Sequence, residues 1–190
     1  SVPYLITCPF ESSGVNPTSI SLTKNPCDTA ENNLKIIDTH PIDGVKKKFG
    51  VCSKQISYKN PEFTIKFIEW VHLVKILGAE KIHFYIKQVN PDFESVVKYF
   101  EESGYIETQP FLEPSTVSNF NKDSYETYVL EQNMLNDCFY RVRHLYEYVV
   151  IIDFDEIIMP LKATDMNWSD LFVSMGSKLH HDVYYADNVF

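Results

Sequence analysis

The chain has 190 residues, of which 44% are hydrophobic and 14% aromatic, so it can bury a core and is not a disordered polypeptide. Its formal net charge of −9 argues against nonspecific binding to nucleic acid and against an anionic membrane surface as the main partner. The length is that of one domain, and no run approaches the roughly 20 apolar residues of a membrane-spanning helix.

The four cysteines, Cys8, Cys27, Cys52 and Cys138, lack the Cys-x-x-Cys spacing of a zinc site. Their even number permits disulfides, and Cys8 with Cys27 is the first pair to test. Free buried thiols are an equal alternative. Residues 167–169 form an Asn-Trp-Ser glycosylation sequon, which a protein can use only in a secretory lumen.

Turn-forming residues dominate residues 1–44, which hold five of the 10 prolines. Short β-like pieces, YLITC at 4–8 and LKIID at 34–38, lie between the turns. We therefore expect residues 1–44 to form a β-rich extension packed on the main domain.

From residue 45 onward, strand-like segments alternate with segments of helical periodicity. The strands are predicted at 48–56, 81–87, 105–112 and from 148 on, and the helices at 62–77, 93–102, 125–145 and 168–175. A loop is expected at 113–121. The order β-α-β-α-β-α-β predicts an α/β fold with a mainly parallel sheet flanked by helices. Because residues 187–190 are strand-like and no helix follows, we expect the domain at 45–190 to be truncated at its C-terminus.

Three carboxylates, Asp153, Asp155 and Glu156, interrupt an apolar run at the carboxyl end of the fourth strand. Residues two apart in a strand point to the same side, so both aspartates can face one point while Phe154 enters the core. Glu156 would point the other way. Because both flanks are apolar, open solvent around the carboxylates is the less favoured interpretation. Two close carboxylates suit a hard divalent cation that also binds phosphate oxygens and water.

Two classes of enzyme fit this pattern. A haloacid-dehalogenase-like phosphotransferase uses the first aspartate as its nucleophile, but that pattern wants threonine where this chain has Ile157. Only 35 residues remain after Asp155 for the other motifs of that class. A nucleotide-sugar transferase of the GT-A type instead uses the carboxylates to hold a metal against the diphosphate of the donor.

Several segments together resemble glycosyltransferase family 92, also called domain of unknown function 23. The matching segments are FGVC at 49–52, FIEW at 67–70, LGAE at 77–80, KIHFY at 81–85, NDCFYR at 136–141 and DFDEIIMP at 153–160. They occur in the order and at the spacing of the family, over about residues 45–175.

The resemblance implies a GT-A-like, Rossmann-like nucleotide-sugar-binding domain at 45–190, with the acceptor-binding part missing from the chain. It further implies metal-dependent transfer of a hexose, with inversion, to a glycan acceptor, and galactose from UDP-galactose is the expected donor. Members of the family are typically type II membrane proteins of the Golgi with a luminal catalytic domain, and the anchor is absent from this chain.

The resemblance also suggests roles for individual residues. Asp153 and Asp155 would bind Mn²⁺, or Mg²⁺, and through it the diphosphate, with Glu156 as a supporting group. Asp137 and Arg141 would belong to the donor site, with Asn136 beside them. Arg141 has three possible partners: Asp137 one helical turn away, Glu156, or a phosphate.

The resemblance does not identify a catalytic base. An inverting transfer needs a group that takes the proton of the acceptor hydroxyl. The candidates after the carboxylates are His180, His181, Asp182 and Asp187, and none of them lies in a recognisable motif. A base outside this chain, and a transferase-like binding domain without catalysis, remain the alternatives.

Overall fold

The computed structural model describes residues 6–9, 17–57, 60–110, 125–176 and 182–187. Its centre is a four-stranded sheet in which every strand pair is parallel, with the order β5-β4-β3-β6. The strands are β3 (Lys47–Ile56), β4 (Lys81–Ile86), β5 (Ile106–Pro110) and β6 (Tyr146–Ile151). The prediction of an α/β fold with a parallel sheet is confirmed.

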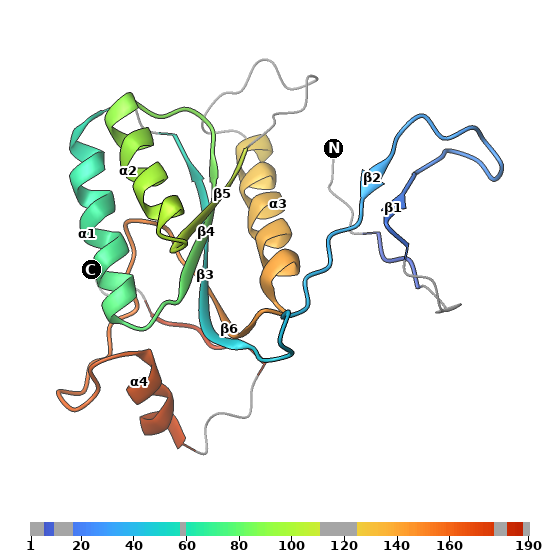
Figure 1. Cartoon of the computed structure of the whole chain (residues 1–190). Helices are drawn as coiled ribbons and strands as arrows, with labels where there is room; N and C mark the ends of the chain where they lie inside the picture. The colour runs from blue at the N-terminus through green and yellow to red at the C-terminus, as the bar shows by residue number, and fades with distance from the viewer. Residues whose placement is uncertain (1–5, 10–16, 58–59, 111–124, 177–181, 188–190) are drawn as a thin grey trace.

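Helices cover both faces of this sheet (Figure 1). Two helices, α1 (Glu62–Ile76) and α2 (Pro91–Glu102), lie on one face, and α3 (Tyr125–Val142) lies on the other. The short α4 (Trp168–Met175) follows the last strand. The helices lie close to the predicted ranges, although α3 ends three residues earlier than expected, and the predicted loop at 113–121 falls outside the described residues.

The N-terminal extension has less β-structure than predicted. Its two strands, β1 (Ser19–Ile20) and β2 (Leu34–Lys35), pair antiparallel over two residues each, and all four residues are exposed. The described part of the YLITC segment, residues 6–8, is not in a strand. Contact with the α/β unit occurs near the end of the extension, where the ring of His40 stacks on His144 at 5.2 Å. The proposed boundary at residue 44 remains a prediction.

The larger core lies between the sheet and the α1–α2 layer. Apolar side chains of α1 at helical spacing, including Phe67, Trp70, Val71 and Val74, are at most 4% exposed and pack on the buried strands. Gly78 adopts a φ of +110° just after α1, where its lack of a Cβ allows the chain to leave the helix and begin β4.

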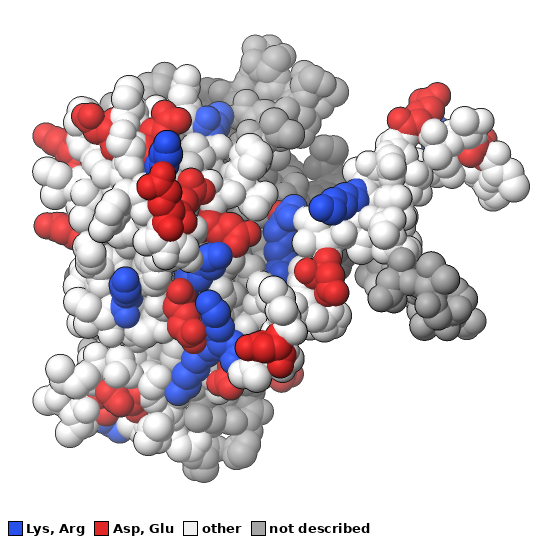
Figure 2. Space-filling model, viewed as in Figure 1, with Lys and Arg blue, Asp and Glu red and all other residues white. Residues whose placement is uncertain are grey.

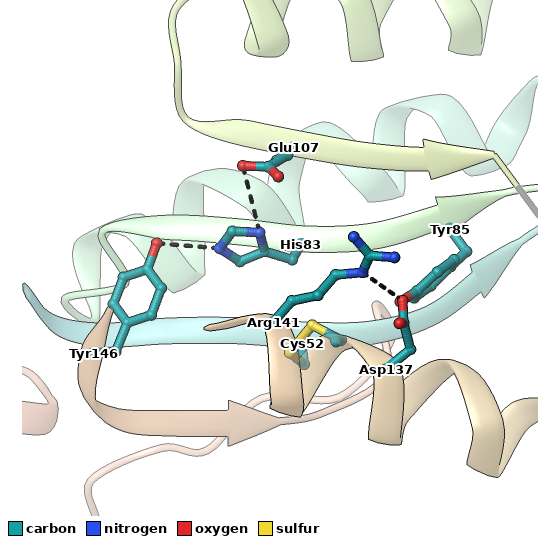
Figure 3. The surroundings of a disulfide bond; sticks show 8 residues. Cys52, His83, Tyr85, Glu107, Asp137, Arg141 and Tyr146 are labelled. Carbon is teal, nitrogen blue, oxygen red and sulfur yellow. Dashed lines mark hydrogen bonds and ion pairs between the residues drawn. A yellow bond between two sulfur atoms is a disulfide. The ribbon is translucent and has the colours of Figure 1, made fainter. Parts of the chain in front are cut away.

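A smaller core on the α3 face contains a disulfide between Cys52 in β3 and Cys138 in α3, whose Cα atoms are 6.0 Å apart (Figure 3). The expectation of a Cys8–Cys27 pair is therefore wrong, because both of these cysteines are free and exposed. The alternative of free buried thiols is also wrong for Cys52 and Cys138. The pairing joins positions 86 residues apart because the sheet brings the middle of β3 under α3.

Gly50 of β3 is required by the position of Tyr146. A Cβ built on Gly50 would lie 2.5 Å from ring carbon Cδ2 of Tyr146, closer than any real side-chain contact. The missing side chain therefore makes room for the aromatic ring, which is 2% exposed.

We predict that Gly50→Ala lowers the free energy of unfolding by about 1–3 kcal/mol, because the added methyl group overpacks a rigid part of the sheet. Chemical denaturation of Gly50→Ala, Tyr146→Ala and the double variant measures the coupling. The cost of Gly50→Ala should shrink markedly when Tyr146 is alanine. Equal costs in both backgrounds would contradict the clash.

We also predict that Cys52→Ala combined with Cys138→Ala lowers the free energy of unfolding by about 2–5 kcal/mol, because the long loop that the disulfide closes is released in the unfolded chain. Denaturation with and without a reducing agent measures this loss. The matched control is Cys8→Ser with Cys27→Ser, which changes exposed thiols and should leave the stability unchanged. A native chain that is insensitive to reduction would argue against the bond.

Candidate functional site

The carboxyl ends of β3 and β6 mark the place where the chain order of the sheet reverses. From β3 the chain continues through β4 to β5 on one side, then crosses to β6 on the other side of β3. In open parallel sheets, ligands bind beyond the carboxyl ends of the strands at this switch point. The predicted carboxylates lie here, since β6 ends at Ile151 and Asp153 follows two residues later.

Asp153 forms an ion pair across this switch point. Its Oδ2 lies 2.8 Å from Nζ of Lys54, near the end of β3, and Oε2 of Glu131 in α3 lies 3.7 Å from the same nitrogen. Three elements thus contribute charges to one place. Burial lowers the pKa of Lys54, but the hydrogen bond with Asp153 and the negative charges of Asp153, Glu131 and Asp155 outweigh it and raise the pKa above its ordinary value.

The turn after β6 positions the three carboxylates. Glu156 N donates to the Asp153 carbonyl at 3.0 Å, and Glu156 Oε2 accepts from Asp153 N at 3.2 Å, so both ends of Glu156 close the turn. The side chain of Phe154 is 6% exposed and belongs to the core, which confirms its predicted burial. Glu156 thus supports the backbone of the aspartate turn.

The expectation that the carboxylates avoid open solvent is wrong for Asp155 and Glu156, which are exposed. The apolar flank at 157–160 is not a strand and is only partly packed, because Ile157 and Ile158 contact the core whereas Met159 is 57% exposed. Two tryptophans bond to its backbone. Trp70 Nε1 of α1 donates to the Glu156 carbonyl and Trp168 Nε1 of α4 donates to the Ile158 carbonyl, each at 2.8 Å. These two hydrogen bonds and the buried Phe154 fix the turn, while the side chains of Asp155 and Glu156 face water.

These residues fit a divalent cation of the Mg²⁺ or Mn²⁺ type only in part. Asp153 and Asp155 are hard oxygen donors at an accessible edge, but within the described residues no three His, Cys, Asp or Glu side chains are grouped to hold a metal. A cation held by two carboxylates, with the remaining positions filled by water and phosphate oxygens, agrees with this donor set.

Asp137 and Arg141 form a second polar group on the α3 face, joined to β4 (Figure 3). Arg141 Nε donates to Asp137 Oδ2 at 2.7 Å, and the hydroxyl of Tyr85 donates to the same oxygen. Of the three possible partners of Arg141, the structure shows Asp137. The hydrogen bond with Asp137 raises the pKa of Arg141, whereas burial and then this bond raise the pKa of Tyr85.

The second group is separate from the carboxylate turn. Asp137 follows Glu131 by six residues, about 9 Å along the helix axis, in the direction away from the carboxyl ends of the strands. Asn136 is exposed on α3. The structure thus brings together Asp153 and Glu156 and, separately, Asp137 and Arg141. It does not place all the predicted donor-site residues around one point.

A cavity of about 200 Å³ lies beside the second group, between α3, the strands β4 and β5, and the end of the N-terminal extension. His83, Tyr85, Glu107 and Arg141 are among its lining residues. His83 is buried, with Nε2 3.1 Å from the hydroxyl of Tyr146 and Nδ1 3.8 Å from Oε2 of Glu107. Burial lowers the pKa of His83 to about 4, against the opposing effect of Glu107.

Buried polar atoms without a hydrogen-bond partner gather near the carboxyl ends of the strands. Within the described part of the chain they are Ser53 Oγ, Gln55 Oε1, Thr64 Oγ1 and Asn90 Nδ2. Two of these residues lie in the last four positions of β3, Thr64 lies in the first turn of α1, and Asn90 caps α2. Buried polar atoms are normally paired, so these four are exceptions. Because the atoms are buried, a ligand could pair with them only if their side chains moved.

The candidates for a catalytic base are only partly described. His180 and His181 lie outside the described residues. Asp182 and Asp187 are exposed, on a segment whose Tyr184 packs on Phe172 of α4 at 5.7 Å between ring centroids. This packing associates the segment with α4.

Sequence reasoning missed Lys54 and Glu131. A lysine near the end of an otherwise buried strand was the available signal for Lys54. The partnership could not be predicted, because it depends on the register between β3 and β6 and on the position of α3. On the face seen in Figure 2, lysine and arginine side chains lie beside aspartate and glutamate side chains.

Comparison with known proteins finds similarity to one glycosyltransferase family, by two routes. The sequence model of glycosyltransferase family 92 matches residues 47–187. Glycosyltransferase family 92 protein F13G3.3 of Caenorhabditis elegans is 25% identical over 119 residues, which are 60% of this chain and 23% of that protein. The chain thus matches about a quarter of the length of this curated relative. No solved structure gives a significant match.

We predict that acid destabilises the fold through His83. In the unfolded chain this histidine is protonated below about pH 6.5, whereas in the folded chain its pKa is lowered to about 4. The contribution of neutral His83 to the free energy of unfolding is therefore full above pH 6.5, and it is lost as the pH falls from 6.5 toward 4. Between pH 7 and 4.5, the wild type should lose about 2 kcal/mol more than His83→Asn, measured by urea denaturation. Parallel pH profiles of the two proteins would refute this assignment.

Proposed function

This chain belongs to glycosyltransferase family 92, and we propose that it binds the nucleotide-sugar donor of a metal-dependent hexosyltransferase. The proposed donor is UDP-galactose, and the proposed reaction transfers galactose to a glycan acceptor with inversion. The observation that carries the proposal is the Asp153–Asp155 turn at the switch point of a parallel sheet, because donor diphosphates and metal ions bind at this edge of open α/β sheets.

Asp153 and Asp155 would hold Mn²⁺ or Mg²⁺ in this proposal. The cation would supply positive charge that stabilises the leaving nucleoside diphosphate. The protein would supply the fixed turn. Phe154 anchors the turn in the core, and Glu156 bonds to its backbone, so the two aspartates are oriented before any ligand arrives.

The nucleoside is proposed to lie beside this turn, near the carboxyl ends of β3 and β4. Ser53 and Gln55 belong to the strand that also carries Lys54, and Asn90 follows the end of the adjacent β4. The unpartnered atoms of these three side chains are buried, so a base or ribose could bond to them only if the side chains turned toward the surface. Phosphates would then lie toward the charged residues at the carboxyl ends of β3 and β6.

Asp137 and Arg141 are proposed as residues near the donor sugar, as the family resemblance suggests. Their pairing holds α3 to β4 through Tyr85 and leaves Arg141 on the wall of the cavity. The base that would deprotonate the acceptor is not assigned to a residue of this chain.

A secretory location is proposed, namely the Golgi lumen, with the acceptor glycan and the donor delivered there. The buried Cys52–Cys138 disulfide supports this proposal, because such bonds form and persist in oxidising compartments. In the part of the chain that the structure describes, no helix is both long and apolar enough to cross a membrane.

We predict that Asp153→Asn and Asp155→Asn each weaken UDP binding in the presence of Mn²⁺ by about tenfold or more, because each change removes a charged metal ligand. Isothermal titration of UDP at saturating Mn²⁺ measures the effect, and titrations of UDP-galactose, UDP-glucose and GDP-mannose then rank the donors. Glu102→Gln, an exposed change at the C-terminal end of α2, is the control and should bind as the wild type does. Unchanged UDP affinity in both aspartate variants would contradict the proposed donor site.

A further inference from the structure

Lys54 is an unusual residue for its position. Residues 49–53 of β3 are buried, and the strand lies between two partners in the sheet, yet Lys54 places a charge two positions before the strand ends at Ile56. Its side chain is 35% exposed. A lysine so near a buried strand interior is costly unless its charge is compensated, so its environment calls for a specific explanation.

The backbone directs this side chain to the switch point. In the pairing of β3 with β4, Cys52 is opposite His83 and Gln55 is opposite Tyr85, so β3 holds one extra residue between these pairs. Such an irregularity re-aims the side chains that it contains, and irregularities of this kind are frequent beside active sites. On the other side, pairing with β6 ends at Cys52 and Ile151, and Lys54 then contacts the turn that follows.

The ammonium group of Lys54 is not saturated by its neighbours in the described structure. It has three N–H donors. Asp153 accepts at 2.8 Å, whereas Glu131, at 3.7 Å, is an electrostatic neighbour beyond hydrogen-bond distance. The flexible four-carbon stem of lysine allows the ammonium to move by several ångströms without moving β3.

Lys54 and a divalent cation would compete for Asp153, because both are positively charged. A divalent cation on Asp153 would lie within a few ångströms of the present ammonium position, where like charges repel strongly. A diphosphate bound with that cation would bring new negative oxygens to the same crevice, and these oxygens are good acceptors for an ammonium. Both effects move Lys54 from Asp153 toward the diphosphate.

We propose that Lys54 is a charge-exchange residue of the donor site. It neutralises and orients Asp153 when no cation is bound, and it binds the diphosphate of the nucleotide when the cation takes its place. This inference rests on the proposed function, and it adds a nucleotide-binding residue that lies outside the carboxylate turn and outside the NDCFYR segment. Lys54 thus weakens the binding of the cation by itself and strengthens the binding of the cation together with a nucleoside diphosphate.

The proposal gives effects of opposite sign for Lys54→Met, a change that keeps the length of the side chain and removes its charge. Mn²⁺ alone should bind about twofold to fivefold more tightly, because the competing ammonium is gone. UDP at saturating Mn²⁺ should bind about tenfold more weakly, because a charge-assisted bond to phosphate is lost. A lysine that merely stabilised the local structure would not strengthen the binding of Mn²⁺.

Electron paramagnetic resonance of free Mn²⁺ measures the first affinity, and isothermal titration of UDP measures the second. Lys54→Arg keeps the charge and should hold both affinities near those of the wild type. The matched control is Lys81→Met, which removes a lysine of β4 that pairs with Glu107 at 3.2 Å, and it should change neither affinity. Thermal unfolding checks that each variant is folded.

The possible results separate the two proposals. If the wild type binds Mn²⁺ and UDP, but Lys54→Met leaves either affinity unchanged or shifts both in the same direction, the role of Lys54 is wrong and the donor site stands. If the wild type binds neither ligand, the proposed function fails and the inference about Lys54 fails with it.

Discussion

The packing of α3 against β3 is the constraint on which the rest of the structure depends. The Cys52–Cys138 disulfide joins the middle of β3 to the C-terminal part of α3, and Gly50 gives Tyr146 room beside them. With this distance fixed, the first half of α3 brings Glu131 to the switch point, and the second half brings Asp137 to Tyr85. A shift of one helical turn, about 5.4 Å, would separate both polar groups from their partners.

Most of the fold could be predicted from the sequence because its signals are local. Buried parallel strands are short apolar runs, and α1 and α2 place apolar residues at helical spacing, so neither kind of element depends on distant partners to be recognised. The N-terminal extension had weaker signals, since prolines mark turns without specifying which strands pair. Within the described residues, the extension forms one short strand pairing of two residue pairs.

In the candidate site, too, the features with local signals could be predicted and those that depend on distant partners could not. The position of Asp153 and the burial of Phe154 follow from alternation within one short segment. Lys54 and Glu131 were missed because they join Asp153 through the strand order, an irregular register and the placement of a helix, none of which is encoded in neighbouring residues. The disulfide could not be predicted for the same reason, because its cysteines are 86 residues apart in the sequence.

The alternation of polar and apolar residues in DFDE also explains how a charged turn can be rigid before it binds anything. A turn of carboxylates in water would be disordered by mutual repulsion, but Phe154 anchors this one in the core and Trp70 binds the carbonyl of Glu156. Lys54 offsets the charge of Asp153 from the neighbouring strand. The turn is therefore held in place by apolar burial and by one lysine on Asp153, and a ligand that binds there need not supply the energy of ordering the turn.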